Sequence, residues 1–255
     1  MHKTPYLSVQ TTGHDNGYRV YWCTDLHYGI VSVRPSGSIP AEREIAVAEI
    51  AALHHLLTVA EVAGRDRTGE ELEVELSRGV IQKAVKHLRK EHECYFTHLH
   101  WFRTQFSDAK LSVPKHSKAE PHEINNHLTS GLDWGSRAMF LSEPIDIPSQ
   151  PLKAPVFSTG IGEVVISIHA VKQFQRRNSM ESTSKSWRKI RSMIANEKMV
   201  MSNIDQSVLN QKAQKWHRSD AQYSDCARSW QLVLLPENTY WILATLYQRT
   251  DIRAF

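Results

Sequence analysis

The chain has 255 residues, of which 23% are charged, and its net charge is +4. This length allows one large domain or two of ordinary size. No apolar run approaches the roughly 20 residues of a membrane-spanning helix, and the N-terminal MHKTPYLSVQ lacks the apolar core of a signal peptide. We therefore expect a soluble, cytoplasmic protein with no membrane partner.

The charge divides unevenly about residue 150. Residues 151–255 carry 15 Lys and Arg against 8 Asp and Glu, a net +7, whereas residues 1–150 carry 16 against 19, a net −3. A basic half favours a polyanionic partner, although an ordinary solvated surface can carry the same surplus. His98 and His100 would share one face of a strand, but their spacing matches no recognised metal site. We expect no metal and no cofactor.

The first half of the chain alternates strand and helix patterns. Apolar and β-branched runs separated by turn residues predict three short strands in a meander, over residues 6–9, 18–23 and 29–33. Residues 41–57 lack Gly and Pro and repeat apolar residues at a helical period, which predicts an amphipathic helix. The elements that follow are a strand at 72–76, a helix at 80–91, a variable middle with Trp101 and Phe102, a strand at 110–114 and a helix at 122–132.

Four local strings give this half a family resemblance. They are YLSVQTTGHDNG, AVAEIAALHHLL, LEVELSRGVIQKAV and VPKHSKAEPHEINNHL. In this order and spacing, residues 5–135 resemble the RNase H fold. The resemblance implies a mixed α/β domain whose clustered carboxylates hold two Mg²⁺ ions at a phosphodiester.

The resemblance also indicates that this cluster is degenerate. The four acids of the family fall on Thr12, Glu49, Leu76 and Asn126. Only Glu49 is an acid, and one carboxylate cannot hold a metal pair. Asp25 or Glu75 would replace a lost acid if the register is shifted by one residue. We expect a degenerate RNase H-like domain, residues 1–141, that binds RNA, an RNA/DNA duplex, a protein partner or the neighbouring domain.

A second domain is predicted after a proline-rich linker. Residues 142–157 contain four prolines and no periodic pattern, which indicates a boundary before residues 158–255. The elements expected there are a strand at 164–168, a helix from His169, an amphipathic helix at 184–200, a short strand at 215–223, and strands at 229–235 and 240–247 joined by a four-residue loop. The predicted fold class is α+β in two domains, the second being a small helix-plus-antiparallel-sheet domain.

The residues best suited to chemistry lie in EVVISIHAVKQFQRR, residues 163–177. An apolar strand delivers His169 to the first turn of a basic helix, and an imidazole is a common general acid or base. Together with the following helix, a basic strand and the terminal LATLYQR, this stretch resembles the metal-independent ribonuclease toxins related to RelE, colicin and barnase, over about residues 160–250. Gln173 departs from that pattern, which has an arginine there.

Metal-free cleavage of RNA requires a base for the 2′-hydroxyl, an acid for the leaving oxygen, and cations for the phosphorane. The predicted catalytic residues are His169, Arg177, Arg218 and Tyr247, and the predicted substrate-binding residues are Lys172, Arg176, Lys215 and Thr245. His169 could instead cap or pack at the start of its helix. The predicted function is a metal-independent endoribonuclease of toxin or mobile-element type. The alternative is a non-catalytic adaptor that binds nucleic acid, or a protein partner or inhibitor.

Overall fold

The computed structural model describes residues 5–37, 39–65, 67–87, 90–130, 137–148, 156–196, 199–204, 207, 209–210, 219–226, 230–237 and 239–248. The chain divides into two compact units, Met1–Lys153 and Ala154–Phe255, which are described separately. Both units mix helices and strands, which confirms the α+β class. The division at residue 153 falls inside the proline-rich segment. Among the described residues, no helix combines the length and apolarity that crossing a membrane requires.

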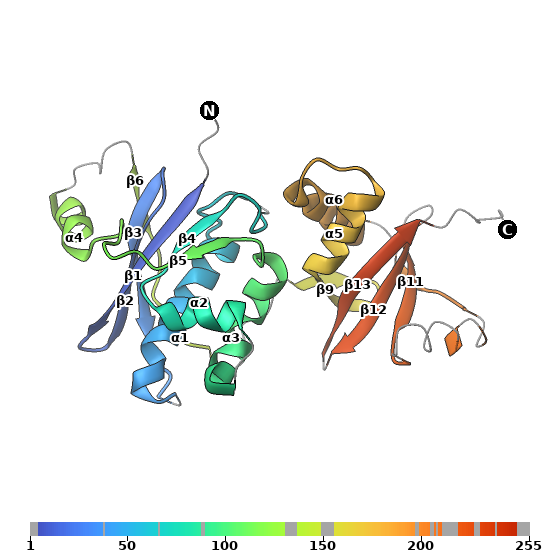
Figure 1. Ribbon diagram of the computed structural model, residues 1–255, viewed down its shortest axis with the longest axis horizontal. Helices are drawn as coiled ribbons and strands as arrows, with labels where there is room; N and C mark the ends of the chain where they lie inside the picture. The colour runs from blue at the N-terminus through green and yellow to red at the C-terminus, as the bar shows by residue number, and fades with distance from the viewer. Residues whose placement is uncertain are drawn as a thin grey trace. The chain divides into compact units, whose positions relative to one another are not determined.

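The first unit is built on a sheet with the strand order β5-β4-β1-β2-β3-β6, to which β7 adds by pairing with β3 (Figure 1). The first three strands form an antiparallel meander, and the others run parallel to their neighbours. The strands are β1 (Tyr6–His14), β2 (Gly17–Cys23), β3 (His27–Arg34), β4 (Glu73–Glu75), β5 (Lys110–Ser112), β6 (Ala138–Leu141) and β7 (Ile145–Asp146). The helices are α1 (Ala41–His54), α2 (Gly79–Lys86), α3 (Glu93–Gln105) and α4 (Pro121–Ser130), with a short π-helix, η1 (His55–Val59), and a short 3-10 helix, η2 (Lys90–His92).

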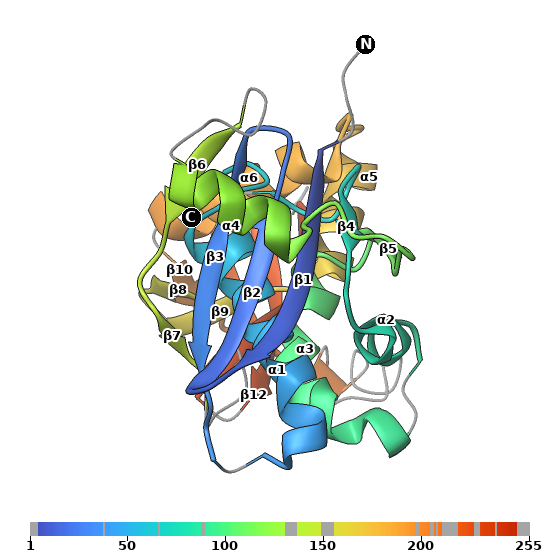
Figure 2. The ribbon, with the colours of Figure 1, turned by 90° about the vertical axis from the view of Figure 1, so that its left-hand side faces the viewer.

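Helices cover both faces of this sheet. Side chains alternate between the faces along each strand, and α1 contacts β1, β2 and β3 on one of them. On the other face, Tyr21 and Tyr28 pack with Ile124 of α4. Figure 2 shows α4 in front of β1 to β3, with α1 behind them. The odd-numbered residues Leu7, Val9 and Thr11 of β1 therefore belong to the α1 face.

Helix α1 differs from the amphipathic helix that the sequence predicted. Every residue from Ala46 to Leu53 is buried, because α1 lies between the sheet and helices α2 and α3. The periodicity identified the helix, but α2 and α3 pack against α1 and cover its other side as well.

Residues 93–105 form helix α3, where the sequence predicted only a variable middle. Burial of aromatic side chains accounts for it, since Trp101 packs edge to face on Phe102 and Phe106 at 5.2 and 5.7 Å. Tertiary packing here outweighs a run of weak helix formers. The placement of His98 and His100 on a strand was wrong, because both belong to α3. Helix α2 also ends at Lys86, before the predicted residue 91.

The second unit contains a sheet with the order β10-β11-β12-β13-β9-β8. Its pairs are antiparallel except β9 with β13, which is parallel. The strands are β8 (Val156–Thr159), β9 (Gly162–Ile166), β10 (Met199–Met201), β11 (Gln222–Cys226), β12 (Trp230–Glu237) and β13 (Tyr240–Gln248), and the helices are α5 (Ile168–Arg177) and α6 (Thr183–Asn196). Two residues, rather than the predicted four, connect β12 and β13. Strand β10 occupies the end of the segment predicted as helix 184–200.

Helix α6 and one side of α5, which contacts β13, pack on one face of this sheet. Val171 and Phe174 from α5 and Trp187 and Ile190 from α6 share a buried core with strand leucines. Those leucines are Leu232, Leu234, Leu243 and Leu246. The side chains between them along β12 and β13 therefore belong to the opposite face, which carries the candidate site.

Candidate active site on the sheet of the second unit

Helix α5 presents one polar face. His169, Gln173 and Arg177 are four residues apart and so lie in a row on the helix. The buried residues Val171 and Phe174 form a separate face toward the core. Ser167 caps the helix, its side chain accepting a hydrogen bond from the amide of Ala170 at 3.1 Å. The cap comes from Ser167, which leaves the His169 imidazole exposed for another role.

A β-bulge sets the phase of β13. Val233 of β12 pairs with Thr245, but the next residue, Leu234, pairs with Leu243, so Ala244 is an additional residue in β13. Because of it, both Leu243 and Leu246 reach the core although they are three residues apart. Thr245 and Tyr247 then lie together on the opposite face, as the sequence predicted for these two residues.

Two rows of paired residues cross this face. Tyr223, Val233 and Thr245 are successive partners across β11, β12 and β13. Asp225, Gln231 and Tyr247 form the neighbouring row. Directly opposed side chains in an antiparallel sheet have Cβ atoms about 5 Å apart and interact. The first row is largely apolar, whereas the second is polar.

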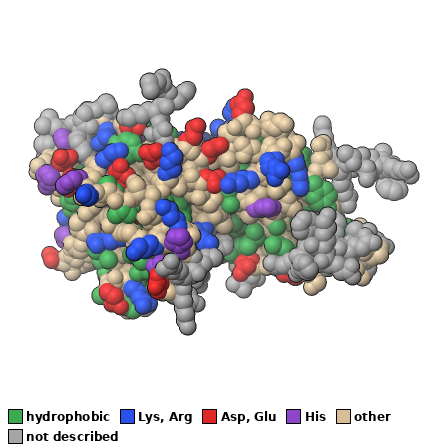
Figure 3. All heavy atoms as spheres, in the orientation of Figure 1, with side chains coloured by type: hydrophobic (Ala, Val, Ile, Leu, Met, Phe, Trp, Pro, Cys, Tyr) green, Lys and Arg blue, Asp and Glu red, His purple; other side chains and the backbone are tan. Residues whose placement is uncertain are grey.

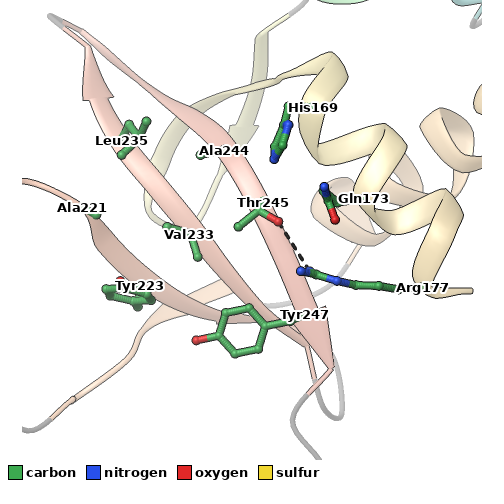
Figure 4. Close-up of a pocket in the computed structure, with 10 residues that line it drawn as sticks. All are labelled: His169, Gln173, Arg177, Ala221, Tyr223, Val233, Leu235, Ala244, Thr245 and Tyr247. Atoms are coloured by element: carbon green, nitrogen blue, oxygen red, sulfur yellow. Dashed lines mark hydrogen bonds between the residues drawn. The ribbon is translucent and has the colours of Figure 1, made fainter. Parts of the chain in front are cut away.

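The α5 row and the sheet face enclose a pocket of about 660 Å³. Figure 4 shows His169, Gln173 and Arg177 projecting from α5 toward the strands. The lining residues are His169, Gln173, Arg177, Ala221, Tyr223, Val233, Leu235, Ala244, Thr245 and Tyr247. The α5 side is polar and titratable, and the floor is mainly apolar. Such a pocket suits an aromatic ring that carries a polar or charged group at one edge.

Arg177 is held in place at the rim of this pocket. Its Nη1 donates to Thr245 Oγ1 at 3.4 Å and to the carbonyl oxygen of Leu246. A guanidinium has five N–H donors. The groups on Nε and Nη2 take no part in these two bonds, so the side chain can present an oriented pair of donors to an anion.

Tyr247 is part of a partly buried hydrogen-bond network on this face of the sheet. Its hydroxyl donates to Gln231 Oε1. Gln231 Nε2 in turn donates to Asp225 Oδ1 and to Ser202 Oγ, both at 3.2 Å. Gln231 is only 1% exposed. The phenol is thus hydrogen-bonded to an amide that is itself held by two further hydrogen bonds.

The other predicted site residues of this unit lie elsewhere. Lys172 and Arg176 are exposed on α5 and do not line the pocket. Basic side chains gather over α5 in Figure 3, beside an apolar area. Lys215 and Arg218 lie outside the described residues. The structure therefore brings together His169, Arg177, Thr245 and Tyr247, from one helix and one strand.

In the first unit, Glu49 is fully buried and bonded by hydroxyl groups. Its Oε2 accepts from Thr11 Oγ1 at 2.6 Å and from Ser77 Oγ, and its Oε1 accepts from the amide of Ser77 at 3.0 Å. Burial raises the pKa of Glu49, which the bonds from Ser77 and Thr11 and the charge of Arg78 partly oppose. Thr11 and Ser77, rather than the neighbouring Thr12 and Leu76, contact Glu49, because alternation along β1 turns Thr11 toward α1.

The other candidate acids do not reach Glu49. Glu75 pairs in register with Ser8 on the other face of the sheet, and its carboxylate lies 3.1 Å from Lys118 Nζ. Asp25 lies in the turn between β2 and β3, next to the start of β1. Asn126 is exposed on α4, which packs on the face opposite α1. Neither Asp25 nor Glu75 therefore lies beside Glu49.

Across the described part of the chain, no three His, Cys, Asp or Glu side chains come together in a way that could hold a metal ion. Comparison with protein-family models, with curated proteins and with solved structures found no match to this chain. The interpretation of the pocket therefore depends on its own residues and their geometry.

The sequence analysis missed three features of the site: the place of Gln173 in the pocket, the buried amide of Gln231 and the β-bulge at Ala244. Each has a signal in the sequence. Gln173 follows His169 by one helical turn and was noted only as a departure from a family pattern. Gln231 is a lone amide within the apolar string WQLVLLP, which indicates a buried polar partner. The bulge at Ala244 is encoded by leucines three apart, at Leu243 and Leu246, in a strand that otherwise alternates.

Proposed function

We propose that the second unit is a metal-independent endoribonuclease. The observation that carries the proposal is the convergence of His169 and Arg177 from α5 with Thr245 and Tyr247 from β13 around one pocket. His169 can supply the base and Arg177 an oriented cation, two of the groups that metal-free cleavage of RNA requires, and the leaving oxygen can take its proton from water. The net positive charge of residues 151–255 supports a polyanionic substrate.

In the proposed reaction, the exposed His169 imidazole takes the proton from a ribose 2′-hydroxyl. The 2′-oxygen attacks phosphorus while the bond from phosphorus to the 5′-oxygen breaks, and the leaving oxygen takes a proton from water. A 2′,3′-cyclic phosphate and a 5′-hydroxyl result, and His169 returns its proton to solvent. Arg177 stabilises the charge on the phosphorane through its Nε and Nη2 donors, and the apolar floor holds the base.

The direct test is cleavage of single-stranded RNA by the full chain in EDTA. Activity is expected to persist, and to fall by about 100-fold or more in His169→Ala and in Arg177→Ala. Arg188→Ala is the matched control, because Arg188 is an exposed arginine on α6 outside the pocket and its removal changes the net charge equally. Loss of activity on chelation, or full activity in His169→Ala, would contradict the proposal.

For the first unit, the proposal is an RNase H-like domain without metal chemistry, which recruits RNA, an RNA/DNA duplex or a protein partner. The order of three antiparallel strands, a helix, and further strands and helices supports the fold. The enclosure of Glu49 by Thr11 and Ser77 supports the loss of metal binding. With Mg²⁺ added, Glu49→Ala is expected to leave the rate of RNA cleavage by the second unit unchanged.

The apolar pocket floor favours one other candidate function, a non-catalytic adaptor. A floor of Val233, Leu235 and Ala221 would suit ligand binding without any reaction. In the same assay, RNA that is retained on the protein but stays intact in EDTA and in Mg²⁺ would establish the adaptor and exclude the ribonuclease.

A further inference from the structure

Gln173 has an amide that points into the pocket. It lies one helical turn after His169 and one turn before Arg177 on α5, and its side chain is half-buried. Figure 4 shows the amide at the end of this side chain projecting from α5 toward β13. Within the part of the chain that the structure describes, no hydrogen bond holds this amide. A half-buried amide of this kind gains a favourable interaction from a ligand that completes its hydrogen bonds.

The spacing along α5 places Gln173 beside the reacting phosphate of the proposed substrate. An α-helix rises about 1.5 Å per residue, so His169 and Arg177 are about 12 Å apart along the axis of α5, with Gln173 about 6 Å from each. In the proposed reaction, His169 takes the proton of the 2′-hydroxyl, and Arg177 binds the phosphate that the 2′-oxygen attacks. A phosphate that is reached from both ends of this row therefore lies in front of Gln173.

The charge of the pocket also indicates a role for this amide. Arg177 is the sole permanent cation among the described residues that line the pocket, and its Nη1 is already bonded to Leu246 and Thr245. The phosphorane carries negative charge on both nonbridging oxygens, and Arg177 approaches them from one end of the row. The Nε2 group of Gln173 has two N–H donors. Because no described neighbour fixes the amide, it can turn this nitrogen toward the anion and its oxygen away.

We infer that Gln173 is a further catalytic residue, whose Nε2 donates a hydrogen bond to a nonbridging oxygen of the phosphorane. The inference rests on the proposed function, which supplies the phosphate. The bond from the 2′-oxygen to phosphorus forms and the bond to the 5′-oxygen breaks, while Gln173 neither gives up nor takes a proton. Charge on the nonbridging oxygens grows as the phosphorane forms, so this hydrogen bond is stronger in the transition state than with bound RNA. It therefore raises kcat rather than affinity.

Steady-state cleavage of single-stranded RNA by the full chain in EDTA tests the inference. Gln173→Met keeps a similar volume but has no N–H donor, so kcat is expected to fall about 100-fold while KM changes by less than about twofold. Gln222→Met is the matched control, because Gln222 is exposed and pairs with Leu234 of the core face, away from the pocket. A fall in kcat of less than about tenfold in Gln173→Met, or one no larger than in the control, would overturn the inference.

Two other variants separate a hydrogen-bond donor from a polar side chain of the right size. Gln173→Glu has nearly the same shape, but its carboxylate can only accept and repels the phosphorane, so kcat is expected to fall further than in Gln173→Met. Gln173→Lys restores an N–H donor and is expected to recover at least about tenfold of the lost activity. Higher activity in Gln173→Glu than in Gln173→Met, or no recovery in Gln173→Lys, would contradict the role as a donor.

An amide in this place has one other use, which is to read the edge of a base. RNAs that differ only in the base at the cleaved position separate the two roles. A donor to phosphate lowers kcat in Gln173→Met equally for every base, whereas a residue that reads the base changes the relative rates. A change in relative rates of more than about fivefold, the usual effect of one neutral hydrogen bond, would overturn the inference in favour of base recognition.

The inference and the proposed function fail in different ways. Cleavage in EDTA that Gln173→Met leaves intact would overturn the role of Gln173 and leave the ribonuclease standing. Absence of cleavage by the original chain would remove the ribonuclease and, with it, this role. Thermal unfolding of each variant, followed alongside, ensures that the rates compared are those of folded protein.

Discussion

Arg177 on α5 donates a hydrogen bond to the main-chain carbonyl oxygen of Leu246 on β13. Strand β9 pairs with β13 only at Trp241–Leu243, and its last residue is Ile166, so the later part of β13 extends past the end of its neighbour. The arginine satisfies part of that strand edge and also contributes to the pocket. Arg177 thus stabilises the edge of the sheet and also takes part in the proposed reaction.

Replacing Arg177 by lysine is expected to reduce RNA cleavage by about tenfold to 100-fold while keeping the net charge. Lysine has a single ammonium group and cannot bond Leu246 and also present two oriented N–H groups to phosphate. Steady-state kinetics in EDTA measure the effect, with Arg188→Lys on α6 as the matched control. A rate within twofold of the original chain would show that Arg177 contributes only its charge.

Replacing Gln173 by arginine is expected to tighten RNA binding, because it adds a cation between His169 and Arg177 on the same helix face. One additional phosphate contact should steepen the dependence of log affinity on log salt by about 0.7 for single-stranded RNA. Fluorescence titrations at several salt concentrations measure this slope. Thr239→Arg adds the same charge at the exposed connection between β12 and β13, and an equal slope in both variants would show that the pocket is not the phosphate site.

The burial of Glu49 is expected to make the free energy of unfolding of the first unit depend on pH. Burial raises its pKa in the folded state, so the folded chain binds the proton more tightly than the unfolded chain. This contribution is present at low pH and is lost as pH rises through the folded pKa. Glu49→Gln should therefore become progressively more stable than the original chain as the pH rises above the ordinary glutamate pKa of about 4.3, as measured by urea unfolding. A difference that does not change with pH would contradict a raised pKa.

Glu49→Ala provides the contrasting result at the same position. It would leave the Thr11 hydroxyl and the amide and hydroxyl of Ser77 without their acceptor in a buried site. The expected loss is about 2 to 4 kcal/mol of unfolding free energy. Glu143→Ala, at a residue that is exposed, serves as the control and should change stability by less than about 0.5 kcal/mol.

Acid is expected to destabilise the first unit through His98. Burial lowers the pKa of His98, and also that of His55. A lowered folded pKa means that the unfolded chain binds more protons, so stability is full above the unfolded pKa of about 6.5 and is lost as pH falls below it. Melting temperatures from pH 5 to pH 7.5 measure the loss, which His98→Leu should reduce. The exposed His122, changed to Gln, should leave the pH dependence as it was.

Periodicity predicted the parts of the fold in which local pattern and burial agree. The strand pairs of the β1–β3 meander, helix α1, and the hairpin of β12 and β13 all carry strong alternation or a clear helical repeat. Helix α3 was missed because its aromatic residues stabilise it through contacts with one another and with α1, which no local window contains. The predicted amphipathicity of α1 failed for the same reason, since α2 and α3 cover its outer side.

The sequence predicted those parts of the candidate site that depend on the spacing of residues within one helix or one strand. His169 and Arg177 share a helix face, and Thr245 and Tyr247 are two apart on a strand. Which side chains these four residues contact, however, depends on how strands that are distant in sequence pair with one another. The contacts of Thr11 and Ser77 with Glu49, and of Gln231 with Tyr247, became clear only from the observed structure. A shift of one residue exchanges the two faces of a strand, so the sequence alone could not place these side chains.

Because Ala244 is the bulge residue, β13 has one residue more than regular pairing with β12 requires. Without Ala244, the order Leu243, Thr245, Leu246, Tyr247 would alternate regularly between core and pocket, so deleting this residue reassigns no side chain. Deleting Leu246 instead would turn Tyr247 into the core. A strand inside a sheet usually tolerates no change in length, yet this one can lose a residue at a single defined point and keep both its packing and its chemistry. Variation in chain length should therefore be accommodated at Ala244 before anywhere else in this hairpin.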